Sequence, residues 1–251
     1  MHYIAVAGKG GTGKTTISAL LVDYLSRKGP EGAATLAIDA DPNSNLGEAL
    51  GLVAPETIAS VLEEVKTVGQ LPAGMTRQAW IQYRLNQLIV ETEHFDLLSM
   101  GTPEGPGCYC YPNDLLRGHL QSLGQNYRHV VIDNEAGLEH LSRRVEQDID
   151  LMLIVSDSSA RGVRTAGRVV EIIKSLNTAV HRMGLVLNRS NPTDAETLAA
   201  EVTATGLELL GTVPDDPAIR AFDLEGKPLV QLPPSSPARV ALAELFSRLG
   251  I

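Results

Sequence analysis

The sequence has very little cysteine, no long hydrophobic run and no excess of positive charge. Its 251 residues include only two cysteines, Cys108 and Cys110, which are too close together to join distant parts of a fold. This spacing excludes a secreted disulfide scaffold. No apolar run approaches the length of a membrane-spanning helix. Acidic residues outnumber basic ones by 30 to 21, and the net charge of −9 is opposite to that of most nucleic-acid or anionic-membrane binders.

The rest of the composition is that of an ordinary globular protein. Hydrophobic residues make up 43% and charged residues 20% of a chain that is long enough for one large α/β domain. The chain has no internal repeat, low-complexity run or long linker, so we expect residues 1–251 to form a single domain. Its first residues are typical of a strand entering a glycine loop rather than of a signal peptide, and we therefore expect a cytoplasmic protein.

Short apolar runs alternate with amphipathic segments along the chain. The runs are continuous, which is typical of strands covered on both faces. They span residues 3–7, 35–38, 95–99, 129–132, 151–155, 184–187 and 207–213. A one-faced apolar period predicts helices between them. These helices span residues 14–28, 75–91, 113–123, 162–176, 194–205 and 237–249. The alternation predicts a single doubly wound, mostly parallel sheet flanked by helices.

A glycine-rich loop follows the first predicted strand. Residues 8–15 read Gly-Lys-Gly-Gly-Thr-Gly-Lys-Thr and precede a predicted helix, which fits the phosphate-binding motif G-x-x-x-x-G-K-[ST] in its required context. Glycines let backbone N–H groups converge on phosphate oxygens, and the helix N-terminus adds positive potential. We expect Lys14 to reach the β- and γ-phosphates and the Thr15 hydroxyl to bind Mg²⁺. The predicted nucleotide-binding residues are Gly8, Gly10, Gly11, Thr12, Gly13, Lys14, Thr15 and Thr16.

Two predicted strands are followed or closed by aspartates. Asp39 and Asp41 lie at the end of the second strand, where ligands bind in open α/β sheets. Asp133 closes a later strand and is expected on the Mg²⁺ side of the site. Helix capping is the alternative for this region, and we expect Asn43 or Asn45 to act as a cap.

Cys108 and Cys110 lie in a loop rich in glycine and proline, just before the helix predicted to begin at residue 113. Thiols near a helix N-terminus have a lowered pKa and are good metal ligands. A closed metal site needs about four protein ligands, and one chain offers two thiolates. Two such pairs facing each other across a two-fold dimer would complete the set. Ni²⁺ and Zn²⁺ both suit four thiolates, and the sequence does not distinguish them.

The phosphate loop carries a second lysine, Lys9, which phosphate binding does not require. A K-G-G-x-G-K-T loop resembles the deviant Walker A class of P-loop ATPases, which contains Min-type, Par-type and nitrogenase-iron-protein-like members. The resemblance implies that Lys9 reaches the nucleotide of the other subunit in a dimer, as an arginine finger does elsewhere. It also implies that Asp41 orients the attacking water and that Asp39 supports Mg²⁺ through a water.

Recognition of the base leaves a fainter signal. Asn188 and Arg189 follow one strand, and Pro214 and Asp215 follow the next. In the resembled class, the asparagine at the first of these positions pairs with the edge of the adenine. The loop after the next strand packs against the base. The residues alone are equally consistent with a turn at Asn188.

The combination of motifs narrows the resemblance. The deviant loop, the Cys-x-Cys pair and residues 133–141 (Asp-Asn-Glu-Ala-Gly-Leu-Glu-His-Leu) together resemble the CooC-type nickel-insertion ATPases and their close sister family, AcsF. The former mature carbon monoxide dehydrogenase, and the latter is linked to acetyl-CoA synthase. The resemblance implies an ATP-dependent nickel chaperone whose homodimer depends on nucleotide and metal. Its client would be one of these two apo-enzymes, and neither nucleic acid nor membrane would be a partner.

Two other functions fit the same phosphate loop. An ATP-gated iron–sulfur reductase would normally draw its ligands from two well-separated cysteines per chain, which this sequence lacks. A Min- or Par-type positioning ATPase would need a basic amphipathic helix at a membrane or a DNA-binding surface. Arg161, Arg164 and Arg168 share one predicted helix face. That face is either simply solvated or docks to an acidic partner or the dimer mate.

Overall fold

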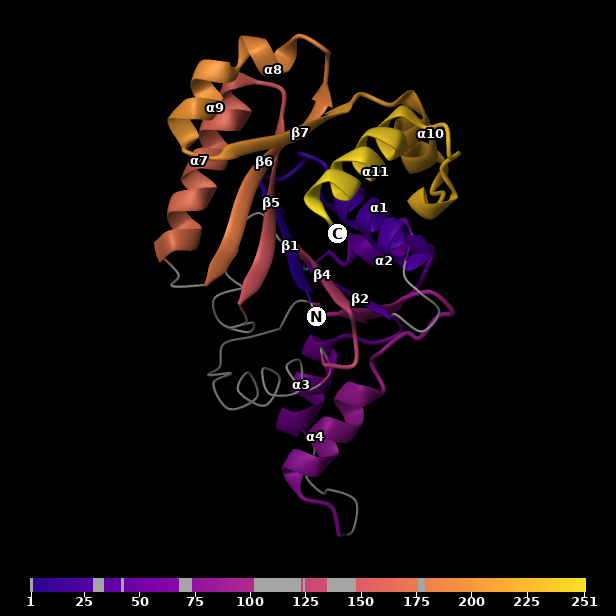
Figure 1. Ribbon diagram of the computed structural model, residues 1–251. Helices are drawn as coiled ribbons and strands as arrows, with labels where there is room; N and C mark the ends of the chain where they lie inside the picture. Colours follow the sequence, from indigo (N-terminus) through magenta and orange to yellow (C-terminus); the bar gives the residue numbers. More distant parts are fainter. Residues whose placement is uncertain are drawn as a thin grey trace.

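A computed structural model describes residues 2–28, 34–41, 43–67, 74–101, 123, 125–134, 148–175 and 179–251. Within them, seven strands form one sheet in which every neighbouring pair is parallel (Figure 1). The strands are β1 (His2–Gly8), β2 (Thr35–Ala40), β3 (Asp96–Ser99), β4 (His129–Asn134), β5 (Ile149–Asp157), β6 (Val180–Ser190) and β7 (Glu208–Pro214). Their order across the sheet is β3-β2-β4-β1-β5-β6-β7. Each predicted apolar run falls on one of these strands, and the predicted fold class is confirmed.

The helices agree with the sequence where the apolar period is long. They are α1 (Lys14–Lys28), α2 (Asn45–Leu50), α3 (Ile58–Thr67), α4 (Arg77–Asn86), α7 (Ala160–Ser175), α8 (Asp194–Thr197), α9 (Ala199–Thr205), α10 (Pro217–Glu225) and α11 (Pro237–Leu249), with a 3₁₀ turn η1 (Leu229–Gln231). The predicted helix 194–205 is broken at Leu198 into α8 and α9. The predicted helix 113–123 lies outside the described residues apart from Leu123.

The helix predicted over 75–91 is shorter in the structure, where α4 spans Arg77–Asn86. The apolar residues at the ends of the predicted range are explained by contacts other than a continuing helix. The Thr76 hydroxyl accepts a hydrogen bond from Ala79 N at 3.2 Å and so caps α4 at its start. After the helix, Leu88 is buried and Val90 pairs with Leu97 in an antiparallel bridge. Apolar residues beyond Asn86 therefore serve the core without continuing the helix.

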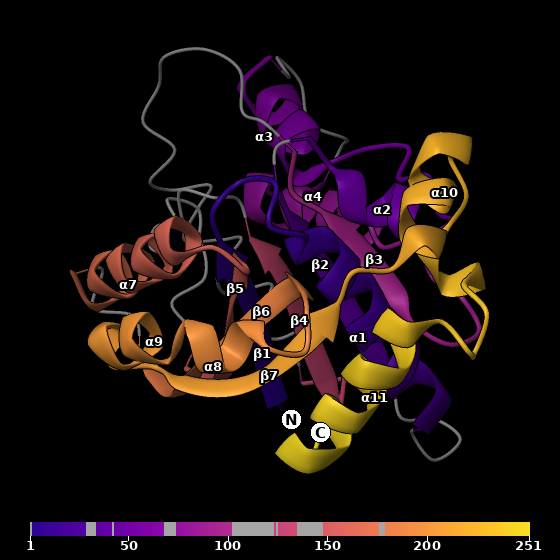
Figure 2. The same ribbon diagram turned by 90° about the horizontal axis from the view of Figure 1, so that it is seen from above.

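Helices cover both faces of the sheet, as Figure 2 shows. One face packs against α1, α2 and α11, with Ile17, Leu21 and Phe246 fully buried in that layer. The other face packs against α3, α4, α7 and α9, with Ile81 and Val163 fully buried there. Burial on both faces explains why the strands read as continuous apolar runs.

The parallel register brings the ends of the central strands to one edge. Val6 and Asp39 are both register partners of Asp133, and Gly8 is the partner of Val155. A Cβ atom on Gly8 would lie only 2.2 Å from the Val155 carbonyl oxygen, so no other residue fits where the chain leaves the sheet. The loop after β1 therefore starts between β4 and β5, beside the Asp133 carboxylate near the end of β4.

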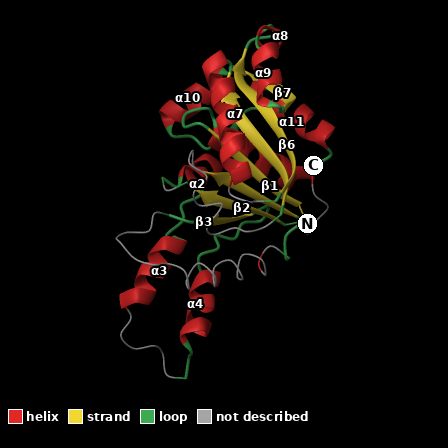
Figure 3. Ribbon diagram, turned by 90° about the vertical axis from the view of Figure 1, so that its left-hand side faces the viewer, coloured by secondary structure: helices red, strands yellow, loops and turns green. Residues whose placement is uncertain are grey.

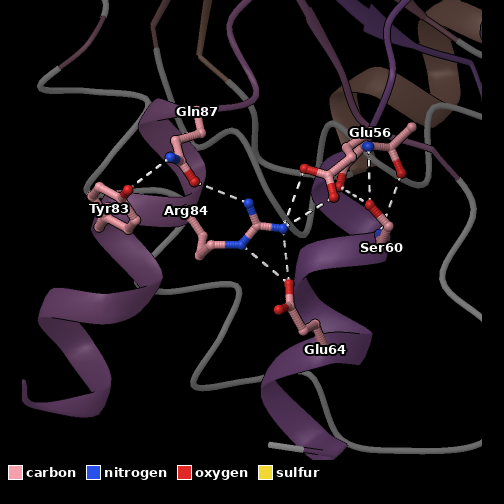
Figure 4. Close-up of polar contacts among 7 residues, drawn as sticks. Glu56, Ser60, Glu64, Tyr83, Arg84 and Gln87 are labelled. Atoms are coloured by element: carbon pink, nitrogen blue, oxygen red, sulfur yellow. Dashed lines mark hydrogen bonds and ion pairs between the residues drawn. The ribbon is translucent and has the colours of Figure 1, made fainter. Parts of the chain in front are cut away.

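Helices α3 and α4 extend beyond the sheet as an arm, which we define as residues 56–67 and 74–87 (Figures 1 and 3). Arg84 joins its two helices: its guanidinium contacts Glu64 of α3 at 2.9 Å and Glu56 at 3.0 Å (Figure 4). A third nitrogen donates to the Gln87 side-chain oxygen at 3.0 Å, and Gln87 in turn donates to the Tyr83 hydroxyl. The planar Arg84 guanidinium thus holds the two parts of the arm together by contacting two carboxylates at once.

In the part of the chain that the structure describes, none of the helices combines the length and the hydrophobicity needed to cross a bilayer.

Candidate nucleotide site

The loop after β1 has the backbone shape that its glycines predict. Gly11 and Gly13 have φ values of 78° and 93°, in the region that favours glycine. The Thr12 hydroxyl donates to the Lys9 carbonyl oxygen at 2.8 Å and closes a tight turn. A Cβ atom on Gly11 would meet nothing within 4 Å, so the outer side of the loop is open. The loop can therefore accept a ligand through its backbone N–H groups.

The two lysines of the loop have different surroundings. Lys14, at the first position of α1, is 7% exposed, and its ammonium donates to the Lys9 carbonyl oxygen at 3.4 Å. It therefore lies over the loop, where the motif predicts a phosphate. The Lys9 side chain is on the exposed side of the turn, as a contact with a second molecule requires. Its predicted role in trans stays a prediction, because the structure contains one chain.

Asp133 is a buried carboxylate with one satisfied oxygen. It is 1% exposed, and its Oδ1 accepts a hydrogen bond at 3.0 Å from the hydroxyl of Ser18, which lies one turn after Thr15 on α1. Among the residues that the structure describes, none donates a hydrogen bond to its buried Oδ2. Burial raises the pKa of Asp133 to about 6, while the nearby Thr15 and Ser18 hydroxyls and the Lys14 ammonium oppose the rise. A buried oxygen without a donor, beside Thr15, fits a Mg²⁺ ion in the position that the sequence predicts.

Asp39 holds the start of α2. Its Oδ2 accepts from Leu46 N at 2.9 Å and its Oδ1 from Asp41 N at 3.2 Å. Burial, and then the nearby charge of Asp133, raise the pKa of Asp39 to about 7, against the effect of these backbone donors. This carboxylate satisfies a free N–H group of the helix end, which is the task expected of Asn43 or Asn45. That capping prediction is wrong: Ser44 precedes α2 in a left-handed conformation and makes no side-chain cap.

Asp41 forms a turn of its own. Its Oδ1 accepts from both the backbone N and the side-chain Nδ2 of Asn43, each at 2.9 Å, and its carbonyl oxygen accepts from Ser44 N. The residue is half-buried at the same edge as the phosphate loop.

Asn188 supports the phosphate loop from β6. Its Nδ2 donates to the Thr12 carbonyl oxygen at 2.8 Å, and its Oδ1 accepts from Arg189 N at 3.0 Å. A Cβ atom on Gly13 would lie 2.2 Å from this Nδ2, so the loop needs glycine there as well. Arg189 has a φ of 53° and reaches the Gly11 carbonyl oxygen at 3.4 Å. The two residues predicted to read the base therefore contact the phosphate loop directly.

The second part of the predicted base site lies at the end of β7. Pro214 is half-buried and Asp215 is exposed. The neighbouring Asp216 is 5% exposed and caps α10 by accepting from Ala218 N at 2.9 Å. Its other oxygen accepts from the Ser236 hydroxyl at 2.5 Å, and these hydrogen bonds lower its pKa although burial opposes them. Asp216, which the sequence reasoning missed, thus fixes the loop that carries the predicted base-binding residues.

A pocket of about 320 Å³ adjoins the phosphate loop. It lies between the first turn of α1, helix α2 and the end of α10. Its lining residues are Thr15, Thr16, Asn45, Glu48, Ala49, Phe222, Asp223, Gly226, Lys227 and Leu229. Of these, the sequence predicts only Thr15 and Thr16 as site residues, because α2 and α10 are too short to leave a clear apolar period.

Cys108 and Cys110 lie outside the described residues. Among the described ones, no group of three or more His, Cys, Asp or Glu side chains is arranged to hold a metal ion.

Comparison with known proteins places this site in a large group of nucleotide-binding proteins. Residues 3–229 match the family described as the CobQ/CobB/MinD/ParA nucleotide binding domain. An uncharacterized ATP-binding protein of Methanocaldococcus jannaschii is 39% identical over 98% of this chain and 97% of its own length. The carbon monoxide dehydrogenase accessory protein CooC of Rhodospirillum rubrum is 34% identical over the same shares. A chain of the MinC:MinD cell division protein complex of Aquifex aeolicus, 23% identical, has a TM-score of 0.73 over 100% of this chain and 96% of its own, a likeness in fold.

Proposed function

The chain belongs to the CobQ/CobB/MinD/ParA nucleotide-binding family and is a P-loop ATPase of the MinD/ParA class, and from this premise we propose that it is an ATP-dependent nickel chaperone. In this proposal, Cys108 and Cys110 bind the metal at the interface of a homodimer. The client is carbon monoxide dehydrogenase or acetyl-CoA synthase, in the cytoplasm. The whole chain, residues 1–251, acts as one domain.

ATP hydrolysis is assigned to the edge that carries the phosphate loop. The backbone of the loop and Lys14 hold the phosphates, while Thr15 and Asp133 hold Mg²⁺, which neutralises phosphate charge when bound. Asp41 orients the attacking water, and Asp39 supports the Mg²⁺ side through a water. Lys9 of one subunit stabilises charge in the site of the other. The structural observation that supports this arrangement is the buried Oδ2 of Asp133, to which none of the described residues donates a hydrogen bond.

Base binding is assigned to Asn188, Arg189, Pro214 and Asp215. The contact of the Asn188 carboxamide with Thr12 supports a position next to the phosphates. For the same carboxamide to pair with an adenine edge, it must share or exchange its present hydrogen bonds. Binding of the base and the shape of the phosphate loop would therefore be coupled through this one side chain.

The Cys-x-Cys pair is the observation that carries the metal role. It occurs in a chain that is 34% identical to a carbon monoxide dehydrogenase accessory protein over nearly its whole length. Because each chain offers two thiolates, two chains supply the four ligands of a closed site. Dimerisation driven by ATP would bring the two pairs together, and hydrolysis would separate them, which links the nucleotide to metal capture and release.

The test is the double variant Cys108→Ala with Cys110→Ala. We expect it to bind ATP as the native protein does and to lose tight binding of Ni²⁺ and Zn²⁺, measured by metal analysis after equilibrium dialysis. Lys14→Ala, which keeps both thiols, is the matched control for loss of the ATPase alone. Stoichiometric metal in the double variant would contradict the proposal.

Two further measurements separate the alternative functions. Iron and a brown colour in protein purified without oxygen would favour the iron–sulfur reductase. DNA binding that survives moderate salt would favour the Par-type positioning ATPase. For the Min-type alternative, the apolar residues Leu242, Leu245 and Phe246 of α11 are buried in the core, so they do not offer a face to a membrane.

A further inference from the structure

A pocket between α1 and α11 is separate from the one beside the phosphate loop. Its volume is about 380 Å³, within the range of about 300–1,000 Å³ that is usual for small-molecule sites. The two helices lie side by side in Figures 1 and 2. On α1, the pocket extends from Leu20 to Lys28, about 12 Å along the helix, and it begins about 9 Å beyond Lys14. The pocket therefore occupies the far half of the helix that carries the phosphate-loop lysine.

The floor of this pocket is apolar and already packed. Leu20 of α1 and Leu242 of α11 line it and are only 3% and 1% exposed. The Tyr24 ring, which forms part of the wall, packs against the fully buried Phe246 with the ring centroids 5.3 Å apart. Ala243 lines the pocket from α11 and has no atoms beyond Cβ to fill it. An apolar group bound here would leave water for a preformed surface.

The lining carries more positive than negative charge. Its charged residues are three cations and two carboxylates, namely Arg27, Lys28, Arg239, Asp23 and Glu244. The Asp23 carboxylate is 6% exposed and contacts two guanidinium groups, that of Arg27 at 2.9 Å and that of Arg239. The Lys28 ammonium contacts the Tyr24 hydroxyl and lies 4.6 Å from the centroid of its ring. The one buried carboxylate is thus already shared by two cations, and the other, on α11, is exposed.

Arg27 is oriented in a way that leaves its terminal nitrogens available. Only its Nε donates to Asp23, and within the described chain the two terminal nitrogens have no acceptor. The last turn of any helix favours cations, so Arg27 and Lys28 would not mark a site by their charge alone. Here, however, Asp23 fixes the guanidinium at the side of an apolar pocket. Its terminal nitrogens can hold a second carboxylate through two parallel hydrogen bonds.

We propose that the pocket between α1 and α11 binds an amphipathic carboxylic acid, a small molecule with one carboxylate and an apolar body. The carboxylate accepts hydrogen bonds from Arg27 and Lys28, and the apolar body lies on the floor beside Ala243. A cationic ligand is the weaker fit because the lining has an excess of positive charge. A wholly polar anion would gain nothing from the apolar floor. The proposal concerns a site apart from the nucleotide and holds whether or not the cysteines bind metal.

The experiment titrates the full chain with decanoate in a calorimeter. We expect saturable binding of one decanoate per chain. Ala243→Leu fills the pocket with a residue that suits a helix, and we expect it to weaken binding about tenfold or more. The matched variant Ala241→Leu adds the same side chain at a half-buried position outside the lining and should bind within about twofold of the native protein. ATP turnover at the native rate shows that each variant is folded.

A second pair of variants tests the recognition of the carboxylate. Arg27→Gln with Lys28→Gln removes both cations and keeps an N–H donor for Asp23, and we expect it to weaken binding about tenfold or more. Lys174→Gln with Arg182→Gln makes the same change at exposed positions elsewhere and should stay within about twofold of native. Decanol, which has the same chain without the charge, should bind the native protein about tenfold less tightly than decanoate.

Several results would overturn the proposal. They are no saturable binding of decanoate, equal binding by the native protein and Ala243→Leu, equal binding of decanol and decanoate, and displacement of decanoate by Mg-ADP. A further one concerns vesicles of phosphatidylglycerol. If the protein bound these vesicles through Arg27 and Lys28 but did not bind free decanoate, the basic end of α1 would be a membrane contact and not a pocket for a small acid.

Discussion

Two clusters in this molecule each combine two carboxylates with one cation, and they differ in how far the charges are satisfied. In the arm, Arg84 lies between Glu56 and Glu64, and its side chain contacts both carboxylates within about hydrogen-bond length. At the phosphate-loop edge, Asp133 lies near both Asp39 and Lys14, but one of its buried oxygens accepts no hydrogen bond from the described residues. In the first cluster, the chain itself pairs the cation with both carboxylates. In the second, a buried carboxylate oxygen is left available for a ligand such as a metal ion.

Exposure accounts for the difference. The two glutamates are 45% and 42% exposed, so water shares the task of solvating them, and the two carboxylates raise the pKa of Arg84. Asp39 and Asp133 are almost wholly buried, and burial raises the pKa of both toward neutrality. Buried carboxylates with a strongly shifted pKa are characteristic of sites that bind a charged ligand. The arm, in contrast, uses its charges to join two helices.

Removing the cation should have very different effects in the two clusters, and Lys14→Ala should have the largest. We expect ATP turnover to fall by about 10³-fold, because Lys14 is the buried cation that the motif places against the phosphates. Steady-state phosphate release is the measurement, and Arg84→Ala is the matched loss of a cation at the other cluster. Turnover within about tenfold of native in Lys14→Ala would contradict the assignment.

The second-largest effect that we expect is a pH dependence of the free energy of unfolding, caused by the buried carboxylates at the phosphate-loop edge. Because the folded-state pKa of Asp39 is raised from 3.8 to about 7, its contribution to stability is full below about pH 4 and is lost as the pH rises through 7. Between pH 5 and pH 8, we expect the free energy of unfolding without nucleotide to fall by roughly 2–3 kcal/mol through this group. Asp39→Asn should flatten this slope in urea unfolding.

The half-buried Asp41 provides the control for that slope. Asp41→Asn changes a carboxylate two residues away, and we expect the native pH dependence to persist. If native protein and Asp39→Asn showed the same slope, the buried carboxylate would not carry the effect.

Breaking the arm should have the smallest effect. We expect Arg84→Ala to lower the free energy of unfolding by about 1 kcal/mol, since its partners are largely exposed, and to leave ATP turnover unchanged. Arg84→Lys keeps the charge but not the fork and should recover part of the loss. Chemical denaturation and phosphate release are the two measurements. A tenfold loss of turnover in Arg84→Ala would make the arm part of the catalytic machinery.

The sequence predicts the sheet well because burial on both faces leaves a strong local signal. All seven apolar runs are strands, and the long helices α1 and α11 begin and end where their periods do. Helices α2, α3 and α10 were not predicted. In α2 and α10, six and nine residues hold too few turns to show a period. For α10, the capping Asp216 followed by Pro217 was an available signal.

The candidate site was predictable where a motif fixes its residues and not where the fold brings them together. Lys14, Asp39 and Asp133 follow from motifs at strand ends. The Ser18 hydroxyl that holds Asp133 lies 115 residues away in the chain, and no local pattern joins the two. The use of Asp39 as the cap of α2 depends in the same way on how the chain turns back after β2.

Metal content and molar mass, measured on the same sample, would show whether ATP brings two thiol pairs together around one metal ion. Light scattering after size exclusion, combined with metal analysis, would be run without nucleotide, with ADP and with ATP. We expect one Ni²⁺ or Zn²⁺ per two chains in a dimer with ATP, and no such species in the variant lacking both cysteines. One metal per single chain, or a metal-bearing dimer that forms without Cys108 and Cys110, would contradict it.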